Sequence, residues 1–189
     1  MSRMADFELL ERLCGLNGIS GREDRVRDAI LAEIRPYCSR VTIDPLGNII
    51  AEKSGAQRPK RRLMLDAHMD EVGLIVTNIT EEGYLRFAPV GGLEARVIYG
   101  RRVLINGRPG VIGGKAVHLC SKEEKTEMPS LDKLLIDMGV ESREAAEKIA
   151  VPGDRAVFDS AYTKLENGLI KARALDDRAG CALLLGMIE

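Results

Sequence analysis

The chain has 189 residues, 45% of them hydrophobic and 30% charged, which is the balance of an ordinary globular protein with one domain or one domain plus a smaller one. Its 28 basic and 29 acidic residues give a net charge of -1, so charge supplies no reason to bind nucleic acid or an anionic membrane. The four cysteines are scattered without a CxxC pair, and no signal peptide or membrane span is visible. These features predict a cytoplasmic protein with reduced thiols and with neither nucleic acid nor membrane as a partner.

Two helices are predicted at the start of the chain. Residues 5–18, "ADFELLERLCGLNG", carry apolar residues at helical spacing and then two glycines. In residues 20–37, "SGREDRVRDAILAEIRPY", Ser20 and Glu23 have the spacing of a capping box. Apolar residues then follow at four-residue steps from Val26, and Pro36 is expected to end this second helix.

A hairpin and a buried strand are predicted next. Residues 40–55, "RVTIDPLGNIIAEKSG", contain two short strand patterns around a turn. Residues 61–68, "RRLMLDAH", have the composition of an interior strand that ends in polar residues. Helices, hairpin and buried strand in this order predict an α/β domain with helices on a sheet.

The middle of the chain is rich in β patterns. Between residues 73 and 114 several such runs are divided by glycine-rich turns, which predicts a small antiparallel barrel or sandwich. A short helix capped by Ser142 is expected in "SREAAEKIA", and Asn167-Gly168 predicts a tight hairpin turn.

The last residues, "ALDDRAGCALLLGMIE", predict a helix that is apolar on nearly all sides. Asp176 and Asp177 can cap its N-terminus, although one of them would suffice. Gly180 either allows close approach of a neighbouring strand or is only a small residue in a packed helix. The helix has no stop signal, which predicts a cut through a larger domain rather than a natural terminus.

Two acidic motifs could carry chemistry. On an extended backbone His68 and Asp70 project to the same face, so Asp70 could fix the tautomer of His68 and leave its other nitrogen for a metal. Taken alone, this pair favours a structural histidine over a ligand. The Asp176–Asp177 pair favours capping, with a carboxylate that bridges two metal ions as the alternative.

The other polar candidates have simpler explanations. His118, at the end of a β-like run, is expected to be structural, and the cysteines are expected to be core or neutral residues. Residues 123–127, which include Glu123, Glu124, Lys125 and Glu127, predict a solvated surface loop.

Together, "LDAHMDEVGLIV" and "ALDDRAGCALLLGMIE" resemble the M42 family of metallo-aminopeptidases, which contains glutamyl aminopeptidases and members once labelled endoglucanases. Further segments that resemble the family lie in the expected order, among them "GVIGGKAVHL" and "LLIDMGVESREAAEKI". The resemblance covers essentially the whole chain. It implies an α/β aminopeptidase sheet flanked by helices, truncated here, with an inserted small antiparallel β-barrel or sandwich domain. The expected boundaries are 1–70 and 163–189 for the catalytic domain and 71–162 for the insertion.

The resemblance also implies a site with two divalent metal ions, zinc or cobalt. His68 corresponds to a ligand of one metal, Asp176 to the carboxylate that bridges both, and Asp70 to the residue that orients His68. Met69 and Glu71 match the motif without being ligands. The implied reaction removes N-terminal residues from peptides, and the implied assemblies are homo-oligomers from dimers to dodecamers.

Family members are nearly twice as long as this chain. The general base, expected in an adjacent Glu-Glu pair, and the remaining metal ligands are not found in it. We therefore expect a partial or empty metal site and no activity from this chain by itself. The alternative is a natural short homologue without catalysis that acts as an assembly or binding module.

Overall fold

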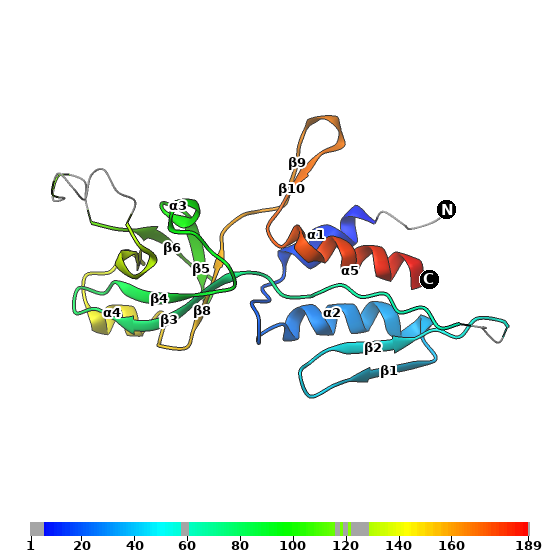
Figure 1. The fold of residues 1–189 in the computed structure, drawn as a ribbon. Helices are drawn as coiled ribbons and strands as arrows, with labels where there is room; N and C mark the ends of the chain where they lie inside the picture. Colours follow the sequence, from blue (N-terminus) through cyan, green and yellow to red (C-terminus); the bar gives the residue numbers. More distant parts are fainter. Residues whose placement is uncertain (1–5, 58–60, 116–117, 119–120, 122–128, 189) are drawn as a thin grey trace. The chain divides into compact units, whose positions relative to one another are not determined.

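The computed structural model describes residues 6–57, 61–115, 118, 121 and 129–188, and it divides the chain into two compact units. The first, here called the α/β unit, comprises residues 1–71 and 161–189, and the second, the barrel unit, comprises residues 72–160. These limits lie one residue and two residues from the boundaries predicted at 70/71 and 162/163. Figure 1 shows the elements of both units.

The α/β unit is built around three helices, which are α1 (Phe7–Gly15), α2 (Asp24–Ile34) and α5 (Leu175–Ile188). The side chain of Asp6 caps α1, because its carboxylate accepts the backbone N–H groups of Glu8 and Leu9 at 3.0 Å each. The bounds of α1, α2 and α5 confirm the helices predicted at the start and the end of the chain. Their buried faces form one apolar core, which consists of Leu9, Leu13, Val26, Ile30, Leu31, Ile34, Cys181 and Leu185.

The predicted capping box of α2 is wrong. The helix begins at Asp24 without a side-chain cap, and the Glu23 carboxylate accepts the N–H of Gly21 at 2.7 Å instead. Ser20 lies too far before the helix start and donates its hydroxyl to the carboxylate of Asp70. A 3₁₀ turn, η1 (Arg35–Tyr37), follows α2 and contains Pro36.

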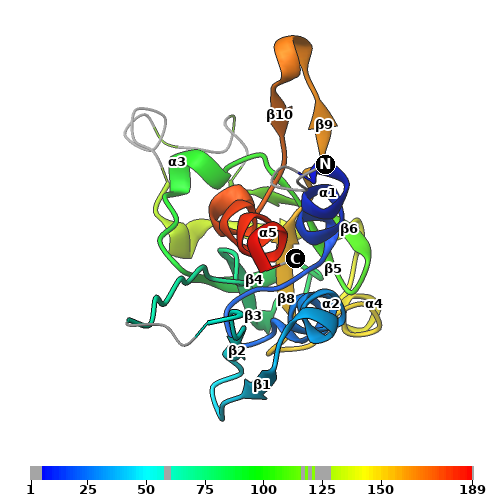
Figure 2. The same cartoon turned by 90° about the vertical axis from the view of Figure 1, so that its right-hand side faces the viewer.

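Two hairpins complete the α/β unit. Strands β1 (Arg40–Ile43) and β2 (Ile49–Glu52) pair antiparallel, as predicted. Strands β9 (Thr163–Lys164) and β10 (Ile170–Lys171) pair in a second hairpin, which extends away from α1 and α5 in Figures 1 and 2. Its connection includes the 3₁₀ turn η4 (Glu166–Gly168) and is wider than the predicted two-residue turn.

The predicted interior strand at residues 61–68 is not formed among the residues that the structure describes. Leu63 and Met64 are 83% and 84% exposed. A strand needs backbone partners on a neighbouring strand, and this segment first finds one at Glu71. There the Glu71 N–H donates to the carbonyl of Gly18 at 2.9 Å, beside an isolated parallel bridge with Ile19.

The barrel unit is a closed barrel of six strands, in the order β3-β4-β7-β6-β5-β8. All its pairings are antiparallel, which confirms the predicted small antiparallel barrel. The strands are β3 (Gly73–Ile79), β4 (Leu85–Val90), β5 (Arg102–Ile105), β6 (Arg108–Gly113), β7 (Leu135–Asp137) and β8 (Arg155–Phe158).

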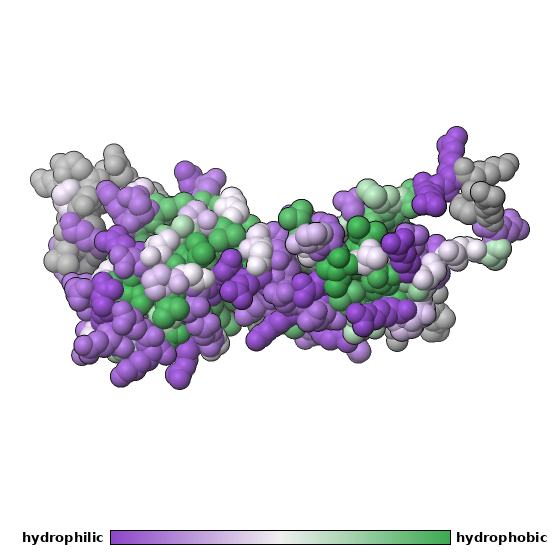
Figure 3. All heavy atoms as spheres, turned by 90° about the horizontal axis from the view of Figure 1, so that it is seen from below, coloured by the Kyte–Doolittle hydropathy of each residue, from purple (hydrophilic) through white to green (hydrophobic). Residues whose placement is uncertain are grey.

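Short helices accompany the barrel strands, namely α3 (Ala95–Ile98), η3 (Leu131–Lys133) and α4 (Arg143–Glu147). Ser142 caps α4 by accepting the N–H of Ala145 at 3.3 Å, as predicted. Apolar side chains reach the surface of both units on the face shown in Figure 3. No helix in the described part of the chain is long and apolar enough to cross a membrane.

Candidate metal centre

His68 lies between two carboxylates that are far apart in sequence. Its Nδ1 is 2.9 Å from Asp70 Oδ1, and its Nε2 is 2.9 Å from Asp176 Oδ1. The side chains of His68 and Asp176 are 56% and 94% exposed, so both reach solvent. The structure therefore brings together the three site residues named from the sequence, across 108 positions of the chain.

Asp70 is held in place from its other oxygen. The Ser20 hydroxyl donates to Asp70 Oδ2, while Oδ1 faces the His68 ring. The hydrogen bond from Ser20, followed by the interaction with His68, lowers the pKa of Asp70. A charged and fixed carboxylate at Nδ1 is the arrangement that sets the tautomer of a metal-binding histidine. The sequence did not indicate the part that Ser20 plays here.

Both carboxylates favour the protonated imidazole. Partial burial lowers the pKa of His68, but the hydrogen bonds with Asp176 and then Asp70 outweigh it, so this pKa lies above its ordinary value. A cation that bound Nε2 would replace the proton there and face Asp176, while Asp70 would keep its contact with Nδ1.

The two adjacent aspartates have different partners. Both have non-helical backbone angles, so the regular part of α5 begins after them. Asp177 Oδ1 accepts the N–H of Gly180 at 2.9 Å, the contact of an N-cap, whereas Asp176 faces His68. Capping is thus confirmed for Asp177. A Cβ on Gly180 would lie 2.5 Å from the Asp177 carboxylate, so this glycine makes room for the cap and not for a neighbouring strand.

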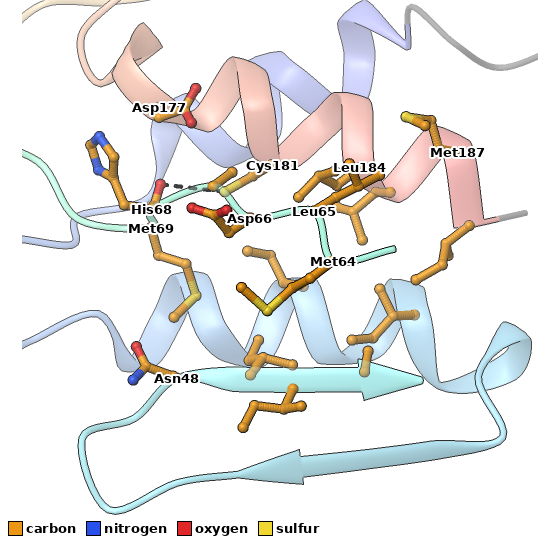
Figure 4. Close-up of a pocket in the computed structure, with 18 of the residues that line it drawn as sticks. Asn48, Met64, Leu65, Asp66, His68, Met69, Asp177, Cys181, Leu184 and Met187 are labelled. Atoms are coloured by element: carbon orange, nitrogen blue, oxygen red, sulfur yellow. Dashed lines mark hydrogen bonds between the residues drawn. The ribbon is translucent and has the colours of Figure 1, made fainter. Parts of the chain in front are cut away.

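A hollow of about 830 Å³ adjoins the site within the α/β unit. Apolar residues of β2, of residues 63–65 and of α5 line it, together with His68, Asp70 and Asp177. Figure 4 shows the segment from Met64 to Met69 running through it, with Met69 pointing towards α2. The Cys181 thiol donates to the His68 carbonyl oxygen at 3.4 Å, which attaches this segment to α5.

Charged residues also lie buried behind the site. Arg178 is fully buried and Glu71 is 6% exposed, and their side chains are 3.8 Å apart. Burial raises the pKa of Glu71, and the neighbouring Arg173 and the Gly18 amide oppose this rise. This buried group was not predicted from the sequence. The available signal was Arg178, the one charged residue that follows Asp177 in the apolar helix α5.

The remaining candidates lie apart from the centre. His118 is exposed in the barrel unit. Cys14 and Cys181 are buried, as expected of core cysteines, and burial raises the pKa of Cys181 to about 11. Residues 123–127 and Cys120 lie outside the residues that the structure describes.

The donors present fit a metal but do not complete a site. An imidazole nitrogen and a carboxylate oxygen are ordinary ligands of zinc and cobalt, and those of His68 and Asp176 converge at the surface. Within the described ranges, no group of three or more His, Cys, Asp or Glu side chains could hold a metal ion. The two residues therefore fit as members of a larger ligand set.

The chain is similar in sequence to proteins of a known family. The family model described as M42 glutamyl aminopeptidase matches residues 47–189. The chain belongs to this family. This chain is 34% identical over 194 residues to the lysyl aminopeptidase of Pyrococcus furiosus, and the match covers 98% of this chain and 54% of that protein.

Solved structures agree with this assignment. The TET aminopeptidase from the archaeon Thaumarchaeota archaeon SCGC AB-539-E09 has a TM-score of 0.90 at 33% identity, covering 96% of this chain and 52% of that one. The TET1 peptidase of Pyrococcus horikoshii, described as assembling into a tetrahedron or a large octahedral shell, has a TM-score of 0.82 at 38% identity, covering 96% and 55%. The chain spans about half the length of the curated relatives that it matches.

Proposed function

We propose that this chain carries part of the dinuclear metal centre of an aminopeptidase that removes N-terminal residues from peptides. His68 and Asp176 would hold the metal ions, with Asp176 proposed as the carboxylate shared by both, and Asp70 would orient His68. The observation that carries the proposal is that His68 faces Asp176 with one ring nitrogen while Asp70, anchored by Ser20, holds the other. Zinc and cobalt both suit these donors.

The residues present would prepare the site for this chemistry. Two bound metals would polarise the scissile carbonyl and acidify a water molecule. Ser20 and Asp70 keep the imidazole in one orientation, so its Nε2 needs little reorganisation to bind. Asp177 caps α5 and leaves Asp176 free of that task, with its carboxylate open to solvent.

The chain by itself is proposed to bind metal weakly and to lack peptidase turnover. Two donors cannot hold two ions tightly, and no described residue is assigned as the general base of the reaction. In the whole protein, peptides are the proposed substrates, and the preferred N-terminal residue stays open. The scattered cysteines, of which Cys14, Cys38 and Cys181 are free thiols, support the proposal of a cytoplasmic protein.

A second candidate function is an assembly module without catalysis. It is favoured by the barrel unit, which closes on its own apolar core, and by relatives described as tetrahedra and shells. The whole protein is proposed to form homo-oligomers in either case. Mass photometry tests the oligomer that both candidates share, and calorimetry with Zn²⁺ separates them, because an assembly module would show no metal uptake that depends on His68.

Calorimetry with Zn²⁺ and absorption spectra with Co²⁺ test the principal proposal. Wild type should take up the ion weakly, His68→Ala should lose this uptake, and His118→Ala should keep it because His118 lies outside the site. Uptake that is unchanged in His68→Ala would contradict the proposal. Hydrolysis of aminoacyl-nitroanilides by the chain alone, surviving purification, would contradict the proposed inactivity.

A further inference from the structure

Arg178 joins the two parts of the chain that carry the proposed metal ligands. Its side chain is fully buried, and it lies two residues after Asp176 on α5. Its Nε donates to the carbonyl oxygen of Met69 at 2.6 Å. Met69 is the residue between His68 and Asp70, so one short hydrogen bond connects the start of α5 to the peptide that carries both side chains.

The same guanidinium is anchored at its other end. Nη1 of Arg178 donates to the carbonyl oxygens of Leu13 and Leu16, the latter at 3.2 Å. These carbonyl groups lie at the C-terminal end of α1, where the aligned peptide dipoles favour a cation. Arg178 is therefore fixed against α1 while it holds the Met69 carbonyl.

Arg173 also binds the C-terminal end of α1, but it does not contact the Met69 carbonyl. Its Nε donates to Cys14 O at 3.2 Å, and its Nη2 donates to Gly15 O at 3.1 Å and to Asn17 Oδ1 at 2.6 Å. None of these groups belongs to residues 68–70. Arg173 thus caps α1 much as Arg178 does, without touching the backbone between His68 and Asp70.

Glu71 supplies the countercharge for both arginines. Its Oε1 lies 3.4 Å from Arg173 Nη1 and 3.8 Å from Arg178 Nη2, and it accepts the Gly18 N–H at 3.0 Å. Neither of these two nitrogens has a hydrogen-bond partner among the described residues, so charge holds them beside Glu71. A buried cation needs such compensation.

Gly18 provides the space for the guanidinium. A Cβ at this position would lie 2.7 Å from Arg178 Nη2 and 2.7 Å from Val26 Cγ2. Both distances are shorter than real Cβ contacts, so a larger residue would displace both groups.

We propose that Arg178 is a positioning residue that sets how His68 faces Asp176, by fixing the Met69 carbonyl relative to the start of α5. The proposal rests on the proposed function, since it treats these two residues as metal ligands. Three hydrogen bonds from one rigid planar group define this position, and the single ammonium of a lysine cannot reproduce them. An arginine that only stabilised the fold would act in the same way as Arg173.

Arg178→Lys and its matched control Arg173→Lys test the proposal in the 189-residue chain. Both variants weaken the cap of α1, so both should lower the melting temperature. Arg178→Lys alone should alter the ring signals of His68 in ¹H–¹⁵N spectra of the metal-free protein. It should also weaken Co²⁺ affinity about tenfold or more, the usual effect of losing support behind a ligand, while Arg173→Lys stays within about twofold of wild type.

The outcomes separate this proposal from the proposed function. Folded variants with the same His68 spectrum and the same Co²⁺ affinity as each other would overturn the positioning role. If wild type shows no Co²⁺ uptake that depends on His68, the proposed function fails, and the metal-free spectra still decide the role of Arg178. If Arg178→Lys does not fold, Gly18→Ala displaces the guanidinium without removing it, and an unchanged His68 spectrum there would equally overturn the proposal.

Discussion

The barrel unit and the α/β unit are stabilised by different kinds of interior. The buried cluster of the barrel is wholly apolar, with Leu74, Val103, Ile105 and Ile136 each fully buried. The buried charged residues of the described chain, Glu71 and Arg178, both belong to the α/β unit.

The surfaces of the two units also differ. The barrel closes on itself, so every strand has two neighbours and no edge is left open. In the α/β unit, Leu63, Met64 and Leu65, here called the exposed apolar strip, lie in an extended segment without a strand partner among the described residues. The comparison teaches that the barrel combines an apolar core with closure of its sheet, whereas the α/β unit combines an apolar core with buried charged contacts around the candidate site.

Removing the Glu71 carboxylate should have the largest effect on stability. Glu71→Ala leaves two buried guanidinium groups without a countercharge, which costs about 3–5 kcal/mol for a broken buried ion pair. Urea unfolding followed by circular dichroism measures this loss. Glu33→Ala removes a partly exposed partner of Arg12 and should cost about 0–1 kcal/mol, so equal losses would contradict the importance of the buried group.

Ile136→Ala should destabilise the barrel through a cavity. Ile136 is fully buried in β7, and truncation of such a residue costs about 2–5 kcal/mol. Met64→Ala, in the exposed apolar strip, should change the free energy of unfolding by no more than about 0.5 kcal/mol. A large loss in Met64→Ala would show that the strip is buried in solution and would remove the contrast between the two units.

The adjacent aspartates should separate stability from metal binding. Asp177→Ala removes the cap of α5 and should cost about 1 kcal/mol. Asp176→Ala removes an exposed side chain, so it should leave stability nearly unchanged and abolish Co²⁺ uptake. Thermal melts and Co²⁺ titrations of the two variants check this, and the reverse pattern would exchange the roles assigned to the pair.

Local patterns in the sequence were sufficient for much of the fold. The helical spacing of α1 and α2, the hairpin of β1 and β2 and the capping by Ser142 depend on residues close together in the chain. The strand predicted at residues 61–68 is not formed among the described residues. Its composition is typical of a strand, but it has no backbone partner in the described part of the chain. Composition describes only the strand itself, whereas a sheet requires a second strand.

The same distinction between local and long-range contacts applies to the candidate site. Asp70 beside His68 follows from two-residue spacing on an extended backbone, and their meeting with Asp176 was expected from a family resemblance. Ser20 was misassigned as a helix cap because its partner, Asp70, is 50 residues away. Long-range contacts of this kind leave no periodic pattern in a sequence.

The pH dependence of His68 gives the smallest expected effect and tests the site without metal. Hydrogen bonds from the ring to Asp176 and Asp70 raise the pKa of His68, so the folded state favours its protonated form. This contribution to stability is fully present below the ordinary pKa of histidine and is lost as the pH rises through the raised pKa. Asp176→Asn removes one of the two carboxylates and should bring the pKa of His68 down.

The chain has two histidines, so NMR titration can follow His68 directly once His118→Gln has assigned the other signal. The barrel provides the comparison, since Asp137→Asn lies in that unit and should leave the His68 titration unchanged. A pKa of His68 that is the same in Asp176→Asn as in wild type would mean that the two side chains do not meet in solution. Metal uptake should then also fail to depend on Asp176, because a proton and a divalent ion compete for the same Nε2 beside the same carboxylate.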